Sequence, residues 1–185
     1  MRLNLGCGFD KRDGWLNVDR FAHCQPDRLM DLETTPWDLP SDAFEHVLLK
    51  HVLEHLGAAF PVFAAVMREL YRVTAPGGLV EIHVPHVRHD SFWTDPTHVR
   101  AFTPETFLML SKRQNRRWAE TGATYTLLAL ELDVDFEIEG MVQAFDPRWT
   151  AKIQAGEVTH AEALEISRER WNVAQELQVK LRAVK

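Results

Sequence analysis

A pair of glycines directly after a short apolar run near the N-terminus constrains the fold of this chain most. Leu3-Asn4-Leu5 predicts a β-strand, and Gly6-Cys7-Gly8 predicts a tight turn at its end. The stretch from Trp15 to Asp19 alternates and ends in a carboxylate, so it predicts a second strand. Because open α/β sheets bind ligands at the carboxyl ends of their strands, the turn and Asp19 indicate a ligand site. The simpler interpretation is a structural turn beside an exposed aspartate.

The spacing between the turn and the aspartate limits the kind of ligand. A dinucleotide fingerprint needs three glycines and an acidic residue about 20 residues further on. Here Asp10 stands in place of the third glycine, and Asp19 lies 13 positions after Gly6. This leaves little room for a full crossover helix, which takes about a dozen residues. The sequence therefore disfavours a nicotinamide oxidoreductase and favours a compact nucleotide site.

Further strands alternate with a helix, which predicts a mostly parallel sheet with helical crossovers. Apolar residues at three- and four-residue spacing predict a helix over Ala58–Val73, which Pro76-Gly77-Gly78 ends. The strands around it are expected at Leu29–Leu32, His46–Leu49 and Leu79–Val84.

The C-terminal half predicts three more features. Tyr125–Leu132 and Phe136–Phe145 are expected to form a late antiparallel hairpin, and Thr159–Val184 one long amphipathic helix. A helix is also expected to begin at Thr103-Pro104. With 185 residues, below the roughly 250 at which single cores divide, residues 1–185 are expected to form one domain.

Five motifs in order carry a family resemblance. They are Leu3-Asn4-Leu5-Gly6-Cys7-Gly8, Gly14-Trp15-Leu16-Asn17-Val18-Asp19, Asp31-Leu32, His51-Val52-Leu53-Glu54-His55-Leu56 and Arg72-Val73-Thr74-Ala75-Pro76-Gly77-Gly78. This order resembles class I S-adenosylmethionine-dependent methyltransferases, most of all the small bacterial type-11-like branch. The resemblance extends from Leu3 to about Phe107. It implies a three-layer Rossmann-like fold and S-adenosylmethionine as cofactor.

The resemblance also implies roles for individual residues. Gly6, Cys7 and Gly8 would hold the methionine part of the cofactor, and Asp19 the ribose hydroxyls. The remaining cofactor-binding residues implied are Arg20, Asp31 and Leu32 near the adenine, and Lys50 and His51 at the methionine end.

A histidine-rich and aromatic segment follows the strand that ends at Val84, and residues 83–118 are expected to form the substrate side of the site. As a substrate segment, it would offer His86 or His98 as a base, with His51 as a third candidate. The predicted substrate-binding residues are Arg88, Trp93, Asp95 and Arg100. Two other interpretations remain: an ordered structural loop, or a metal site drawn from His86, His89, Asp90, Asp95 and His98.

Two smaller patterns have simple interpretations. His51 and His55 flank Glu54 in the order His-Val-Leu-Glu-His, which does not match the zinc protease motif, so we expect a helix start at the cofactor rim. No metal site is assigned. Four cations between Lys112 and Arg117 predict a solvated helix end, with a phosphate-binding patch as the alternative.

The predicted function is methyl transfer from S-adenosylmethionine to oxygen or nitrogen of a polar small molecule, such as a sugar or a phosphorylated compound. The alternatives are a non-catalytic cofactor-binding module and a metal-dependent hydrolase using His86, His89 and His98.

Composition predicts the kind of partner and the cellular compartment of this activity. A net charge of −6 disfavours nucleic acid as a partner. Two cysteines fit a reducing compartment, and the absence of a signal-like or membrane-spanning apolar run predicts a cytoplasmic protein without membrane contact. A homodimer through the long terminal helix is a further prediction.

Overall fold

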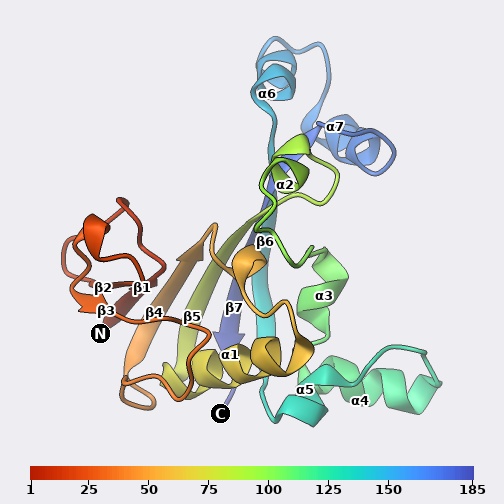
Figure 1. Cartoon of the computed structure of the whole chain (residues 1–185). Helices are drawn as coiled ribbons and strands as arrows, with labels where there is room; N and C mark the ends of the chain where they lie inside the picture. The colour runs from red at the N-terminus through yellow and green to blue at the C-terminus, as the bar shows by residue number, and fades with distance from the viewer.

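The computed structural model describes residues 1–185 and contains one seven-stranded sheet in the order β3-β2-β1-β4-β5-β7-β6 (Figure 1). Strands β1 to β5 pair in parallel, and β7 runs antiparallel to both β5 and β6. The strands are β1 (Arg2–Leu5), β2 (Leu16–Asp19), β3 (Arg28–Leu29), β4 (Phe44–Lys50), β5 (Thr74–Pro85), β6 (Phe136–Phe145) and β7 (Ala174–Ala183). The predicted parallel sheet with a late antiparallel hairpin is confirmed.

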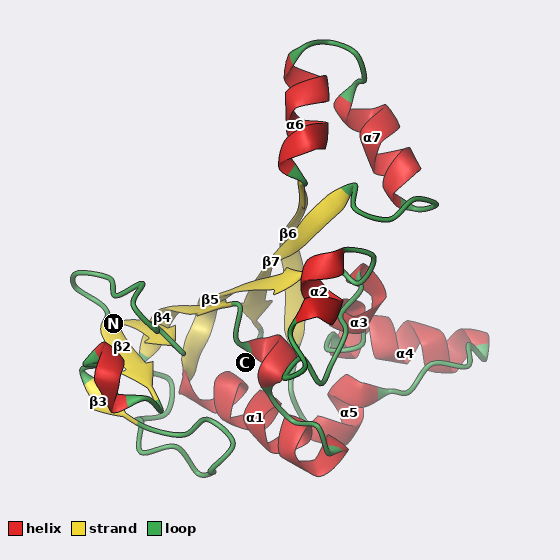
Figure 2. Ribbon diagram, turned by 45° about the horizontal axis from the view of Figure 1, so that its top comes forward, coloured by secondary structure: helices red, strands yellow, loops and turns green.

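Seven α-helices and two short 3-10 helices connect the strands (Figure 2). The α-helices are α1 (Phe60–Val73), α2 (Asp90–Thr94), α3 (Pro104–Leu108), α4 (Lys112–Thr121), α5 (Leu128–Leu132), α6 (Pro147–Gln154) and α7 (His160–Ser167). The 3-10 helices are η1 (Ala22–Cys24) and η2 (Leu53–His55). The helix expected before β5 is confirmed as α1, and Thr103 caps α3 as predicted.

One face of the sheet is apolar and packs against helices. Val47, Val80, Ile82 and Val179 occupy paired positions on this face and are fully buried. They belong to a core of 32 residues that also includes Met67 of α1 and residues from α3 and α5. Burial of this face, at about 25 cal/mol per Å² of apolar surface, is the main force that holds the helices on the sheet.

The opposite face of β4, β5 and β7 is polar. Its paired positions include His46 on β4, Glu81 and His83 on β5, and Lys180 on β7. The helices that enter the core, α1, α3 and α5, do so from the apolar side. Over this part of the sheet the fold therefore has two layers, the sheet and one layer of helices, where three were expected. The reason is connection length, because the segments between β1 and β2 and between β2 and β3 carry no helix longer than η1.

The predicted long terminal helix is wrong. Helix α7 ends at Ser167, Asn172 adopts φ of +58°, and Ala174–Ala183 forms β7. Leu177, Val179 and Leu181 alternate with polar residues, which is a strand period, and the core buries them on one face. The predicted homodimer therefore loses the element that was to form it.

The predicted strand over Tyr125–Leu132 is also wrong. Leu128–Leu132 forms α5, and Leu128 and Leu132 are both buried at four-residue spacing. The buried Asn115 side chain of α4 accepts a hydrogen bond from the Ala129 backbone N–H and fixes the helix start. The hairpin partner of β6 is β7.

Helices α6 and α7 form an arm between β6 and β7 that projects beyond the sheet (Figures 1 and 2). The base of the arm contacts the segment after β5. The Asn172 side chain pairs with Asp90, and Asp146 lies 3.4 Å from His89 Nε2. None of the helices has the length and hydropathy needed to cross a membrane.

Candidate functional site

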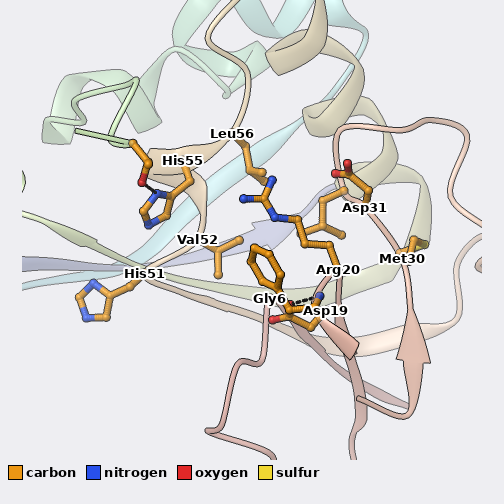
Figure 3. Close-up of a pocket in the computed structure, with 12 residues that line it drawn as sticks. Gly6, Asp19, Arg20, Met30, Asp31, His51, Val52, His55 and Leu56 are labelled. Atoms are coloured by element: carbon orange, nitrogen blue, oxygen red, sulfur yellow. Dashed lines mark hydrogen bonds between the residues drawn. The ribbon is translucent and has the colours of Figure 1, made fainter. Parts of the chain in front are cut away.

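A cavity of about 390 Å³ lies beside the ends of β1, β2 and β4 (Figure 3). Its volume falls in the range of small-molecule sites. The residues that line it are Gly6, Asp19, Arg20, Phe21, Met30, Asp31, Leu32, His51, Val52, His55, Leu56 and Thr97. We refer to it as the first cavity.

The turn after β1 gives this cavity its shape. Gly6 adopts φ of +64°, and a Cβ placed there would lie 2.5 Å from Val52 Cγ2. Asp19 is 8% exposed and is held from both sides, because its Oδ2 accepts from Gly8 N–H at 2.8 Å and its Oδ1 from Phe21 N–H at 2.8 Å. The carboxylate is therefore preorganised at the cavity wall, and each oxygen retains capacity for a further donor.

Six of the nine predicted cofactor residues line the first cavity: Gly6, Asp19, Arg20, Asp31, Leu32 and His51. Cys7, Gly8 and Lys50 do not. The Gly8 N–H donates a hydrogen bond to the Asp19 carboxylate, and the Lys50 ammonium donates to the Asp10 carboxylate at 2.9 Å. Cys7 is buried, and this burial together with nearby Asp19 raises the pKa of its thiol to about 11.

Sequence reasoning missed Phe21, Met30, Val52, His55, Leu56 and Thr97. Phe21, Met30 and Val52 each stand next to a predicted residue, and His55 and Leu56 belong to the motif that begins at His51, so position in the chain was an available signal. Thr97 comes from the segment after β5, and His55 Nδ1 lies 2.9 Å from its hydroxyl. Its position supports the expectation that this segment reaches the rim of the site.

A second cavity of about 460 Å³ adjoins the first, and His51 and His55 line both. It is lined by His51, Glu54, His55, Pro85, Ser91, Asp95, His98, Ala144, Gln175 and Glu176. Three carboxylates and three histidines dominate this lining, and no lysine or arginine belongs to it.

His51 separates the two cavities and is held in the left-handed region, with φ of +55°. Its Nε2 lies 2.8 Å from Glu176, and its Nδ1 lies 3.5 Å from Glu54. The nearby carboxylates of Glu176 and then Glu54 raise the pKa of His51 to about 9. At neutral pH His51 is therefore a cation that donates hydrogen bonds, which does not suit its predicted role as a base.

The other two predicted bases lie in different places. His98 lines the second cavity, and its Nδ1 donates to the Phe92 carbonyl at 2.7 Å, so neutral His98 carries a lone pair on Nε2. His86 lines neither cavity. Its Nδ1 accepts from Arg88 N–H, and burial lowers its pKa. His89 pairs with Asp146 instead, so the proposed cluster of His86, His89 and His98 does not form.

The predicted substrate residues divide in the same way. Asp95 lines the second cavity, whereas Arg88, Trp93 and Arg100 line neither. Arg100 donates to the Gly57 carbonyl and lies 4.3 Å from the Phe63 ring centroid. Trp93 is exposed and lies 6.3 Å from Trp171 of the arm base. The roles of these three as substrate residues stay predictions without a contact in the site.

The basic run lies at the start of a helix, where the helix dipole does not favour cations, and ion pairs stabilise two of its members. It forms the first part of α4, where Lys112 pairs with Asp133 and Arg113 with Glu137, each at 2.5 Å.

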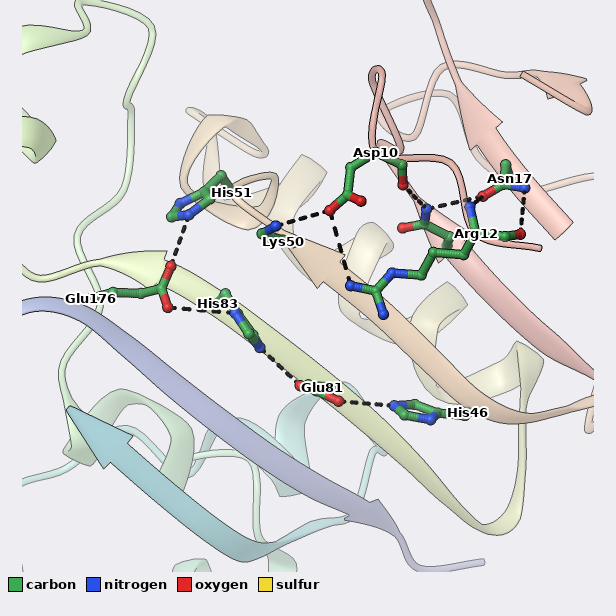
Figure 4. Close-up of polar contacts among 10 residues, drawn as sticks. Asp10, Arg12, Asn17, His46, Lys50, His51, Glu81, His83 and Glu176 are labelled. Atoms are coloured by element: carbon green, nitrogen blue, oxygen red, sulfur yellow. Dashed lines mark hydrogen bonds and ion pairs between the residues drawn. The ribbon is translucent and has the colours of Figure 1, made fainter. Parts of the chain in front are cut away.

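A chain of ion pairs crosses the polar face of the sheet and ends at the site (Figure 4). It runs from His46 through Glu81, His83 and Glu176 to His51. Contacts with Glu176 and Glu81 raise the pKa of His83 against the opposing effect of burial. Burial raises the pKa of Glu176, but hydrogen bonds from His51 and His83 outweigh it and hold that pKa well below its usual range.

This chain predicts a pH dependence of stability. A raised histidine pKa contributes stability that is fully present below the usual value of 6.5 and is lost as pH rises through the folded value, about 9 for His51. We expect the free energy of unfolding to fall by about 1 kcal/mol between pH 6 and pH 9, since solvent screens the half-exposed His51. Glu176→Gln should flatten this slope in urea titrations. Glu139→Gln, whose partner is Arg182, is the matched control; equal slopes in both variants would contradict the assignment.

The first cavity suits a nucleoside with an attached amino acid. Asp19 can accept from vicinal ribose hydroxyls, and Met30, Leu32 and Phe21 offer apolar surface to a base. Asp31 can accept from an exocyclic amine. The missing Cβ of Gly6 lets the Val52 side chain pack against the turn at the cavity wall. The residues present therefore fit S-adenosylmethionine.

The comparisons with known proteins agree with this fit. Residues 3–82 match the model of a methyltransferase domain family. No curated protein matches the chain.

Solved structures with a similar fold include methyltransferases and a cyclase. A SAM-dependent methyltransferase from Archaeoglobus fulgidus has 18% identity and a TM-score of 0.63, with 98% of this chain and 85% of that chain covered. The [4+2]-cyclase SpnF has 16% identity and a TM-score of 0.57, covering 99% and 75%. A 16S rRNA (adenine(1408)-N(1))-methyltransferase from Catenulisporales acidiphilia has 16% identity and a TM-score of 0.55, covering 100% and 85%.

At these identities the solved structures show the fold alone, whereas the family match covers the strands and turns that form the first cavity. Over residues 3–82 the chain is thus similar to a methyltransferase domain family, its strand order is that of the Rossmann-like methyltransferase fold, and S-adenosylmethionine is the expected cofactor of the first cavity.

Proposed function

We propose that the protein methylates an oxygen or nitrogen atom of a polar small molecule that binds in the second cavity. The observation that carries this proposal is the shared wall of the two cavities, formed by His51 and His55. A cofactor in the first cavity and an acceptor in the second would meet at this wall. S-adenosylmethionine carries its methyl group on a sulfonium, which is a good leaving group.

The chain's own residues would orient the acceptor and hold protons. Fixing two reactants in line supplies a large part of the rate of such transfers. Cationic His51, fixed by Glu176, would donate to the acceptor or orient it. His98, whose Nδ1 is bonded to the Phe92 carbonyl and whose Nε2 makes no hydrogen bond, is the base that we favour of the three predicted ones.

The charge of the second cavity favours one class of acceptor. Glu54, Asp95 and Glu176 line it without a lysine or arginine, so a phosphorylated acceptor would meet like charge. We therefore propose a neutral or cationic acceptor rich in hydroxyl or amino groups, such as a sugar or an amino sugar.

The test blocks the second cavity and leaves the first intact. Ala144 lines the second cavity, whereas Val142 lies two residues earlier on β6, is exposed and lines neither. Transfer of labelled methyl from S-adenosylmethionine to hexoses and hexosamines would be measured for Ala144→Phe and, as the matched control, Val142→Phe. We expect at least a tenfold loss of kcat/KM in Ala144→Phe alone, with unchanged cofactor affinity.

Two outcomes would contradict the proposal. Turnover that Ala144→Phe leaves unchanged would place the acceptor elsewhere. Cofactor binding without turnover on any acceptor would favour the non-catalytic module. The second outcome is included because SpnF, a [4+2]-cyclase with a similar fold, shows that the fold does not by itself determine the reaction.

A further inference from the structure

Glu54 carries a buried carboxylate without a hydrogen-bond partner. The residue is 0% exposed, lines the second cavity, and neither of its side-chain oxygens makes a hydrogen bond. The nearest cationic group is His51, whose Nδ1 lies 3.5 Å from Oε1, beyond a good hydrogen bond for a charged pair. A buried, ionised carboxylate is strongly unfavourable unless it is paired or coordinates a metal. The Glu54 carboxylate therefore has one cationic neighbour, at 3.5 Å, and no hydrogen-bond donor, which leaves both of its oxygens available to a ligand.

Two histidines beside Glu54 are oriented as metal ligands usually are. His55 Nδ1 is bonded to the Thr97 hydroxyl, which in turn donates to Asp95 Oδ1 at 2.7 Å. His98 Nδ1 is bonded to the Phe92 carbonyl. In both rings the second nitrogen, Nε2, makes no hydrogen bond. Metal-binding histidines commonly hold the non-ligating nitrogen in this way, which fixes the tautomer and the ring plane.

The three side chains converge. One potential ligand atom from each of Glu54, His55 and His98 lies within 4.8 Å of the other two. The imidazole rings of His55 and His98 are 4.6 Å apart between centroids. Two imidazoles and one carboxylate are a common donor set for Zn²⁺ and for open-sided sites of other first-row divalent ions.

We propose that Glu54, His55 and His98 bind a divalent transition-metal ion in the wall of the second cavity, with open positions for an oxygen donor of the acceptor. The role toward the acceptor rests on the function proposed above, whereas the binding of the ion does not. An acceptor with adjacent hydroxyl groups or a hydroxyl next to a carbonyl is the class such a site takes. The ion and the proton compete for the same lone pair of His98, so His98 is a ligand in the metal-bound protein and can act as the base named above only in the metal-free protein.

A second cluster of possible ligands, Cys7, Asp19 and Cys24, is a weaker candidate. Both oxygens of Asp19 already accept backbone N–H groups, and Cys24 Sγ donates to the Phe21 carbonyl. Asp19 also belongs to the first cavity. The experiment nevertheless includes a variant that distinguishes binding at this cluster from binding at Glu54, His55 and His98.

The full chain, treated with a chelator and free of S-adenosylmethionine, is titrated with Zn²⁺ by calorimetry and with Co²⁺ by absorption spectroscopy. We expect one ion per chain, and at least a tenfold weaker affinity in Glu54→Gln and in His98→Ala. Thr97→Val, which removes the partner of His55, should weaken binding by about tenfold. His160→Ala is the matched control, since His160 is an exposed histidine on α7. Cys24→Ser should leave binding unchanged, and the Co²⁺ spectrum should lack thiolate charge-transfer bands.

Several results would overturn the proposal: absence of Zn²⁺ binding, binding that neither Glu54→Gln nor His98→Ala weakens, or binding lost in Cys24→Ser. If a variant folds poorly, the Tm is measured with and without Zn²⁺ instead. The proposal requires that Zn²⁺ raises the Tm of the wild type and that it does not raise the Tm of His55→Gln. These readouts involve no turnover. Failure of the metal site is therefore distinguishable from failure of the proposed acceptor cavity, which the Ala144→Phe assay tests separately.

Discussion

Replacing Asp19 with alanine is expected to weaken binding of S-adenosylmethionine by about 100-fold. Asp19 is the buried acid at the end of β2, and it lines the first cavity where ribose hydroxyls would donate to it. Each hydrogen bond to a charged group contributes about 1.5–3 kcal/mol, so losing two of them accounts for a change of this size. Calorimetric titration with S-adenosylmethionine and S-adenosylhomocysteine measures the effect directly.

The control must separate ligand contact from support of the turn. Asp19 also accepts from the backbone N–H groups of Gly8 and Phe21, so alanine leaves both without a partner. Asp19→Asn keeps one acceptor oxygen and should retain more of the fold. Asp13→Ala changes an exposed acid in the segment between β1 and β2 that lines neither cavity. Wild-type affinity in Asp19→Ala would mean that this residue only holds the glycine turn.

Substitution of Gly57 by alanine is expected to lower the free energy of unfolding by about 3 kcal/mol. Gly57 adopts φ of +70°, and a Cβ there would lie 2.5 Å from Phe63 Cα, within the backbone of α1. The left-handed conformation costs an ordinary residue about 1–2 kcal/mol, and a clash with a packed backbone adds about 1–3 kcal/mol. The Gly57 N–H also donates to Glu33, and its carbonyl accepts from Arg100.

Gly122→Ala is the matched control for this effect. Gly122 ends α4 with nearly the same φ, +68°, but no atom lies within 4 Å of the Cβ position. Gly122→Ala should lower the free energy of unfolding by only about 1 kcal/mol, because it pays the cost of the left-handed conformation without a clash. Urea unfolding of both variants measures the difference, and equal losses would show that contact with Phe63 contributes nothing.

Local patterns predicted the N-terminal half of the sheet because its strands are short, apolar and ended by glycine or an acid. The C-terminal half was harder, because Thr159–Val184 satisfies a helical period in part while Leu177 to Ala183 satisfies a strand period. Pairing with both β5 and β6 decides in favour of the strand, and no local pattern contains that information.

The site divides in a similar way. Asp19 was predictable because it ends a strand, whereas Asp31 and Leu32 were predicted only through the family resemblance. The role proposed for Glu54 could not be predicted from the sequence, because it depends on the burial of this side chain. It also depends on His98, which lies about 40 residues further along the chain and which the fold brings beside Glu54. His86 directly follows a strand, as the sequence indicates, yet its side chain lines neither cavity.

The polar face of the sheet also has a thermodynamic consequence. Exposure of apolar surface on unfolding sets both the heat-capacity increment and the sensitivity to denaturant. A parallel sheet normally buries both faces, whereas β4, β5 and β7 here present ion pairs on one of them. The chain should therefore unfold with a smaller heat-capacity change per residue than a three-layer protein, and its stability curve should be flatter. A larger share of its stability would then come from whatever ligand it binds.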